Sequence, residues 1–111
     1  MKGTKTRHNW ETFLKFYSEE NKGRKTRLGA FEADDKVFND YWLENGLPLV
    51  GVDIDLHGGL PAIEIILEGF SHIVADAVAL TIHYSLDGIE DGLDIRANDS
   101  NTTVLRFAVE L

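Results

Sequence analysis

Alternating apolar and polar residues dominate the second half of this 111-residue chain and constrain its fold most strongly. A period of two places every second side chain on the same face of a β-strand. Residues 50–56 and 63–67 alternate in this way, and the turn-forming segment 57–61 joins them. Three further strands are predicted from the apolar rows Val78, Leu80, Ile82 and Tyr84, then Leu93, Ile95 and Ala97, then Thr103, Leu105, Phe107 and Val109. The chain is therefore expected to build an antiparallel meander.

The register of the first hairpin is predicted from the requirement that apolar side chains share one face. A slip of one residue would place carboxylates in the core. The pairs that satisfy this requirement are Val52–Leu67, Ile54–Ile65 and Leu56–Ile63. Asp55 then faces Glu64 on the outer side of the hairpin.

The three C-terminal strands are predicted to carry a polar row on their outer face. Their apolar rows coincide when the pairing follows Ile82–Ile95–Leu105 and Tyr84–Leu93–Phe107. The same register places His83, Asp94 and Arg106 side by side on the opposite face. A histidine, an aspartate and an arginine side by side could bind an anion or move a proton. The alternative is a solvated ladder of opposite charges that only stabilises the sheet.

Two further features of the first hairpin are candidate binding elements. His57 precedes Gly58 and Gly59 at a loop tip, where binding residues concentrate. An acidic patch is expected from Asp53, Asp55, Glu64 and Glu68. Facing carboxylates need a nearby cation, which a hard metal ion or a partner's arginine would supply. Because the ligand order of a calcium loop is missing, we predict no metal site and no cofactor. The carboxylates are instead expected to be solvated or neutralised by Lys25, Arg27 or Arg96.

The first half of the chain is predicted to contain two helices separated by a strand. Residues 9–21 show helical spacing of apolar side chains, with Asn9 as the N-cap and Gly23 just past the end. A strand is expected over 24–32. A second helix is expected over 35–45, where Val37, Phe38, Tyr41 and Trp42 would share one face and Gly46 would end it.

These elements predict an α+β fold, with a mostly antiparallel sheet of about six strands and two helices packed on it. The meander is expected to curl into a half-open or closed barrel. Neither a repeat nor a linker divides the chain, so residues 1–111 are predicted to form a single domain with a flexible segment at 1–8.

The charge distribution bears on the partners that the chain can bind. Residues 1–27 contain eight basic and three acidic residues, which gives this segment a charge of +5 within a chain of net charge −8. The acidic remainder would repel phosphates, which argues against nucleic acid as a partner. The basic segment could instead meet the acidic sheet of a second copy. The chain lacks cysteine and a long apolar run, so a cytoplasmic protein without a membrane contact is expected.

Several short motifs carry a resemblance to a known family. They are Trp10-x-x-Phe13-x-x-Phe16, Leu47-Pro48-Leu49-Val50-Gly51-Val52, His72-Ile73 and Leu105-Arg106-Phe107. With these motifs the whole chain resembles a family of small bacterial proteins catalogued only as a domain of unknown function. The resemblance implies a bacterial cytosolic protein and transfers no activity and no site residues.

No catalytic motif or phosphate-binding loop was found in the sequence, which favours a noncatalytic binding or protein-interaction module over an enzyme. The alternative is a small ligand-binding protein or enzyme that uses the row of His83, Asp94 and Arg106, with His57 at its rim. The first hypothesis predicts a surface that docks a protein partner or a second copy. The second predicts a concavity over the row.

Overall fold

The structure, a computed structural model, describes residues 9–34, 37–56 and 59–108. Its elements are α1 (Trp10–Asn21), β1 (Lys25–Asp34), β2 (Val37–Asp55), β3 (Ala62–Leu67), β4 (Phe70–Val74), β5 (Ala77–Tyr84), β6 (Glu90–Ala97) and β7 (Asn101–Phe107). The strands form one antiparallel sheet in the order β4-β3-β2-β1-β7-β6-β5. The α+β class is confirmed, although the described chain has seven strands and one helix rather than six and two. The segment predicted to be flexible, 1–8, lies outside the described residues.

The predicted second helix is wrong, because the described part of 35–45 belongs to the long strand β2. β2 folds back on β1 in a hairpin that begins with the pair Asp34–Val37. Two bulges interrupt this pairing, one at Leu43 and one at Gly46, where φ is +102°. Each bulge inserts a residue in one strand and shifts the alternation of faces by one position. Both bulges lie after Trp42, so they interrupt the alternation only over 43–46; over 37–42 the pairing with β1 overrides a helix-like spacing of apolar residues.

The strand pairs show the predicted faces but a register that differs by two residues. The observed pairs include Val52–Ile65, Ile54–Ile63, Leu80–Ile95, Ile82–Leu93, Leu93–Leu105 and Ile95–Thr103. A shift of two returns every side chain to its original face, so burial alone does not select between these registers. A tight turn decides the β6–β7 register, where the Ser100 N–H donates to the Ala97 carbonyl at 3.0 Å and Ser100 has a φ of +73°.

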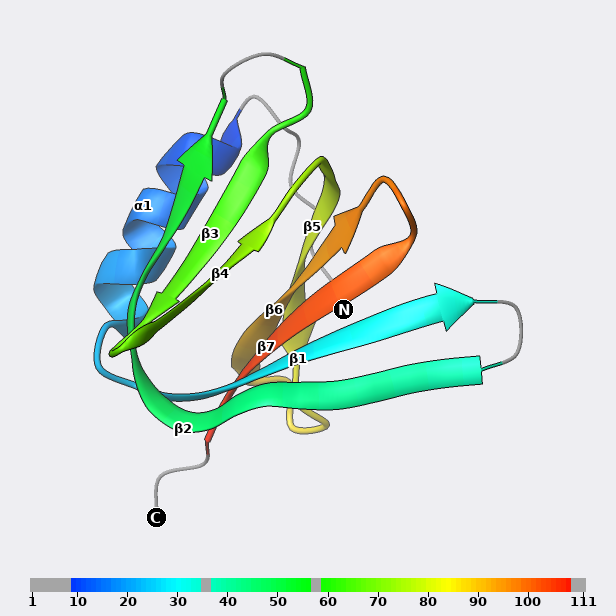
Figure 1. The fold of residues 1–111 in the computed structure, drawn as a ribbon. Helices are drawn as coiled ribbons and strands as arrows, with labels where there is room; N and C mark the ends of the chain where they lie inside the picture. Colours follow the sequence, from blue (N-terminus) through cyan, green and yellow to red (C-terminus); the bar gives the residue numbers. More distant parts are fainter. Residues whose placement is uncertain (1–8, 35–36, 57–58, 109–111) are drawn as a thin grey trace.

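The sheet curls until its two edge strands approach each other at one corner (Figure 1). β4 and β5 stand at opposite ends of the strand order, yet only Ala75 and Asp76 connect them. So short a connection requires the two edges to meet, and Asp76 makes the turn with a left-handed φ of +54°. β4 and β5 do not pair with each other, so the described sheet is a half-open barrel, in agreement with one of the two expected shapes.

The core lies between the inner face of the sheet and α1, which packs mainly against β2. Trp10, Leu14 and Tyr17 form the buried stripe of α1, as the helical spacing predicted. Phe16 points away from this stripe and is 56% exposed. Asn9 makes no side-chain capping bond, contrary to its predicted role. Within the described residues, no helix has the length and apolarity needed to cross a bilayer.

The helix also covers a backbone edge of β2 that no strand pairs with. Beyond Pro48, β2 pairs only with β3, and the segment around α1 takes the place of β1 on its other side. The Gly23 N–H donates to the Leu49 carbonyl at 2.8 Å, and the Val52 N–H donates to Ser18 Oγ at 2.8 Å. These contacts satisfy backbone groups that a bare sheet edge would leave open.

Candidate functional site

The predicted polar row is divided into two separate ion pairs. Because of the two-residue shift, His83 and Arg106 both lie opposite Gly92, while Asp94 lies opposite Val104. Arg106 reaches Asp94 diagonally, with Nη1 2.8 Å from Oδ1, and both side chains are about one-fifth exposed. His83 Nδ1 lies 2.5 Å from Oδ1 of Asp91 instead, because a bulge brings Asp91 beside it. The row predicted from the sequence is therefore not formed.

The two ion pairs fit a role in stabilising the sheet better than a role in binding a ligand. Nη1 of Arg106 also donates to the Leu105 carbonyl at 2.9 Å, which holds the guanidinium against the strand. In the described part of the chain, His83, Asp94 and Arg106 do not line the cavities that border His72, Ile73 or Arg24. The remaining residue of this hypothesis, His57, lies outside the described residues.

The acidic patch of the first hairpin is present, with different pairings from those predicted. Asp53, not Asp55, lies opposite Glu64, and Asp55 lies opposite Ala62. Glu68 is exposed in the turn between β3 and β4, away from the other three. Asp53, Asp55 and Glu64 border a shallow hollow of about 160 Å³ together with Ile73 of β4. We call these four residues the acidic face.

The cations proposed to neutralise this patch lie elsewhere in the sheet. Lys25 and Arg27 are on β1, opposite Pro48 of β2 and Arg106 of β7, and Arg96 is on β6, opposite Thr102 of β7. Strands β1 and β6 belong to the half of the sheet that does not include β3 and β4. In the part of the chain that the structure describes, no group of three or more His, Asp or Glu side chains is arranged to hold a metal ion.

Strand β4 departs from the usual pattern of polar and apolar faces at two positions, His72 and Ile73. Its neighbour β3 buries Ile63 and Ile65, and the register places Val74 and His72 opposite these two residues on the inner side. The polar His72 thus faces inward and is half-buried, whereas Ile73 faces outward and is 61% exposed. Such a local violation of patterning is typical of a site selected for something other than stability.

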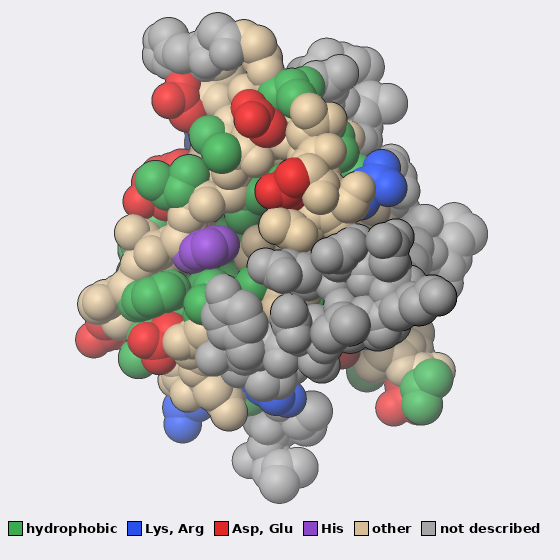
Figure 2. Space-filling model, turned by 45° about the vertical axis from the view of Figure 1, so that its right-hand side comes forward, with side chains coloured by type: hydrophobic (Ala, Val, Ile, Leu, Met, Phe, Trp, Pro, Cys, Tyr) green, Lys and Arg blue, Asp and Glu red, His purple; other side chains and the backbone are tan. Residues whose placement is uncertain are grey.

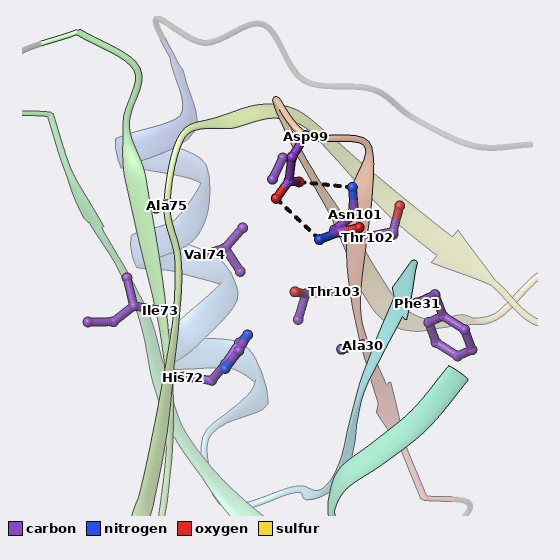
Figure 3. A pocket seen from close by; sticks show the side chains of 11 residues that line it. Ala30, Phe31, His72, Ile73, Val74, Ala75, Asp99, Asn101, Thr102 and Thr103 are labelled. Atoms are coloured by element: carbon purple, nitrogen blue, oxygen red, sulfur yellow. Dashed lines mark hydrogen bonds between the residues drawn. The ribbon is translucent and has the colours of Figure 1, made fainter. Parts of the chain in front are cut away.

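The inner side of β4 borders a cavity where the barrel fails to close. This mouth cavity has a volume of about 240 Å³ and lies between β4 and the strands β1 and β7 (Figure 3). Figure 3 shows His72 and Val74 pointing across it toward Thr103, while Ile73 points the other way. On its rim, Asp99 accepts hydrogen bonds from the backbone N–H and the side-chain amide of Asn101, at 3.0 and 3.2 Å.

Burial lowers the pKa of His72 below its ordinary value of 6.5. The unfolded chain therefore binds a proton at a higher pH than the folded chain, and stability decreases as the pH falls from about 6.5 through the folded pKa. When the pH is lowered from about 7.5 to 5, the free energy of unfolding measured by urea denaturation should fall less for His72→Gln than for the natural chain. An NMR titration of the His72 ring should give a midpoint below 6.5; a midpoint at or above 6.5 contradicts the burial argument.

Three of the four residues 24–27 are basic (Arg24, Lys25 and Arg27), but this cluster does not form one exposed patch. Arg24 places its guanidinium 4.1 Å from the centre of the Phe107 ring and donates to Asn21 Oδ1 at 3.0 Å. Thr26 is buried within the cluster. Arg24 and Phe107 border a further cavity of about 540 Å³ at the β5–β6 loop, lined also by Ser85, Asp87, Ile89, Glu90, Asp91 and Ala108. The guanidinium of Arg24 is therefore held at this end of the barrel by its contacts with Phe107 and Asn21.

The observed architecture is a half-open antiparallel barrel with one helix against its inner face, a mouth cavity and an acidic outer face. Comparison with protein-family models, curated protein sequences and solved structures gave no match to this chain. The resemblance to a bacterial family therefore stays a prediction.

Sequence reasoning missed both His72 and Ile73 as candidate residues, because β4 was not predicted. A signal was present: Glu68-Gly69 is a turn between two runs of apolar residues, and Gly69 has a φ of +81°. The alternation from Phe70 to Val74 would then have placed His72 on the apolar side.

Proposed function

We propose that this protein is a noncatalytic interaction module that binds a basic, extended segment of a partner protein on the acidic face. The observation that carries the proposal is the exposed Ile73 on the edge strand β4. This side chain borders a hollow together with three carboxylates from β2 and β3. An isolated exposed isoleucine is unremarkable, but an apolar side chain beside three groups of one charge has the composition of a selective docking surface.

The charges of the acidic face favour a partner with lysine or arginine. Asp53 and Glu64 lie directly opposite each other on neighbouring strands, where like charges destabilise the pair. A cationic side chain would relieve this repulsion with its head group while its aliphatic stem covers Ile73. The chain carries a net charge of −8, which attracts basic partners over a longer range. Figure 2 shows acidic side chains interspersed with hydrophobic ones on the described surface.

The edge of β4 favours an extended backbone conformation in the partner. In the described sheet β4 pairs only with β3, so its other edge presents backbone donors and acceptors. The strand carries no lysine, aspartate, glutamate or proline, the residues that usually protect an edge against pairing. A partner segment could therefore add as a further strand, as in other cases of β-augmentation.

The proposal is tested with a peptide of alternating lysine and valine residues, followed by NMR chemical shifts of the protein. We expect shifts in β3 and β4, and affinity that decreases as salt is added. The double variant Asp53→Asn/Glu64→Gln should bind this peptide about tenfold more weakly, because two charges facing the peptide are removed.

A control variant separates local charge from net charge. Asp87→Asn/Glu90→Gln removes two exposed charges at the β5–β6 loop, in the other half of the sheet, and should leave the affinity nearly unchanged. Equal weakening by the two double variants would indicate only nonspecific attraction. Equal binding of a glutamate–valine peptide would also contradict the proposal.

A further inference from the structure

The mouth cavity, on the other face of β4, carries a second inference. The cavity lies on the inner side of β4, where the sheet fails to close, and side chains from β1, β4 and β7 line it. Figure 3 shows that His72, Val74 and Thr103 converge on this space from two facing parts of the sheet. Ile73, the apolar residue of the acidic face, points in the opposite direction. The two surfaces lie on opposite faces of β4 and share Ile73, which lines the mouth cavity as well as the hollow of the acidic face.

Two polar side chains in the cavity have hydrogen-bonding groups that the described protein does not use. Thr103 is only 6% exposed, and His72 is half-buried. Neither side chain makes a hydrogen bond to another described residue. Desolvation keeps the imidazole neutral near pH 7, with one ring nitrogen as donor and the other as acceptor. The threonine hydroxyl adds a further donor and acceptor.

The rest of the lining selects against charged ligands and accommodates an apolar face. Among the described residues that line the cavity there is no lysine or arginine, so this part of the lining offers no counter-charge to an anion. Asp99 is the charged group at the rim, and its carboxylate is already held by Asn101. Val74, Ala30 and Ala97 supply apolar walls. A ligand with hydroxyl groups on one side and C–H groups on another matches this distribution.

The volume limits the size of that ligand. At roughly 30 Å³ per water molecule, a cavity of about 240 Å³ holds on the order of eight waters. This is below the usual range for drug-sized ligands and suits a single small ring. We propose that the mouth cavity binds a neutral, polyhydroxylated small molecule of monosaccharide size, through His72, Thr103 and the Asp99–Asn101 pair.

The test uses glucose, galactose, mannose, ribose and myo-inositol as probes, with glucose 6-phosphate, glucuronate and glucosamine as charged counterparts. Binding is followed by two-dimensional NMR of the labelled full-length chain. At least one neutral probe should shift the signals of His72, Asn101 and Thr103, with a dissociation constant of about a millimolar or tighter. A preference for a charged counterpart, or no shift from any neutral probe at tens of millimolar, overturns the proposal.

Variants of Thr103 separate a ligand contact from a structural role. Thr103→Val keeps the shape but removes the hydroxyl and should weaken binding about tenfold, whereas Thr103→Ser keeps the hydroxyl and should bind nearly as well as the natural chain. Thr81→Val, on β5 and outside the cavity lining, is the matched control and should leave binding unchanged. If Thr103→Val folds and binds as tightly as the natural chain, the assignment of the site is wrong.

Discussion

Replacing Gly92 with alanine should lower the free energy of unfolding by about 3 kcal/mol, a fall in Tm of roughly 10 °C. An added Cβ at this position would lie 2.0 Å from the Leu105 carbonyl oxygen, a backbone atom that cannot move without disturbing the β6–β7 pairing. The same Cβ would lie 3.0 Å from both Cδ and Nη1 of Arg106. The missing side chain of Gly92 therefore provides the space through which Arg106 reaches Asp94.

Gly51→Ala is the matched control, because it also adds one methyl group at a buried glycine of the sheet. There the new Cβ would meet only Oγ and Cβ of Ser18, at 3.5 and 3.6 Å, which are ordinary contacts. Urea denaturation of both variants should show a large loss for Gly92→Ala and a change within about 1 kcal/mol for Gly51→Ala. Similar losses in the two variants would contradict the steric account.

Replacing Ser18 with alanine should lower the free energy of unfolding by about 1–2 kcal/mol. Its hydroxyl oxygen accepts the hydrogen bond of the Val52 N–H at 2.8 Å, and the hydroxyl donates to the Leu14 carbonyl at 2.7 Å. Alanine would leave the Val52 N–H without this partner beside the helix, which costs about 1–3 kcal/mol. The better helix propensity of alanine returns up to about 0.5 kcal/mol of this loss.

Two measurements distinguish loss of the Val52 contact from a general effect on the helix. Thr12→Ala, on the exposed side of α1, reports the gain in helix propensity alone and should be neutral or slightly stabilising. Hydrogen exchange at the Val52 amide should accelerate in Ser18→Ala more than exchange at amides in the centre of β7. Unchanged protection of Val52 would show that its amide does not depend on Ser18.

The limits of sequence reasoning are clearest in the strand registers. The alternation placed Leu93, Ile95 and Leu105 on the core side, and all three are fully buried. It did not distinguish the observed register from one shifted by two residues, because both bury the same side chains. The turn closed by Ser100 breaks that degeneracy between β6 and β7. Because the observed register is shifted by two residues, the structure has the two pairs Arg106–Asp94 and His83–Asp91 in place of the predicted polar row.

For the candidate sites, too, the sequence predicts one part of the arrangement and strand pairing decides the other. Asp53, Asp55 and Glu64 could be assigned to one outer face from the sequence, since they alternate with buried residues. Their association with Ile73 could not, because it depends on β4 pairing beside β3. The mouth cavity brings His72 together with Thr103, 31 positions later in the chain, which local patterning does not encode.

The sequence by itself determined the helix at α1, the antiparallel α+β class and the inward face of most strands, because these follow from periods of 3.6 and two residues along the chain. The tertiary structure decided the rest. Pairing with β1 made 37–45 part of a strand despite its helical spacing. The short link of Ala75 and Asp76 joined the two sheet edges and left the barrel half open. These outcomes depend on hydrogen bonds and contacts between distant residues, which the spacing of side chains within one segment does not contain.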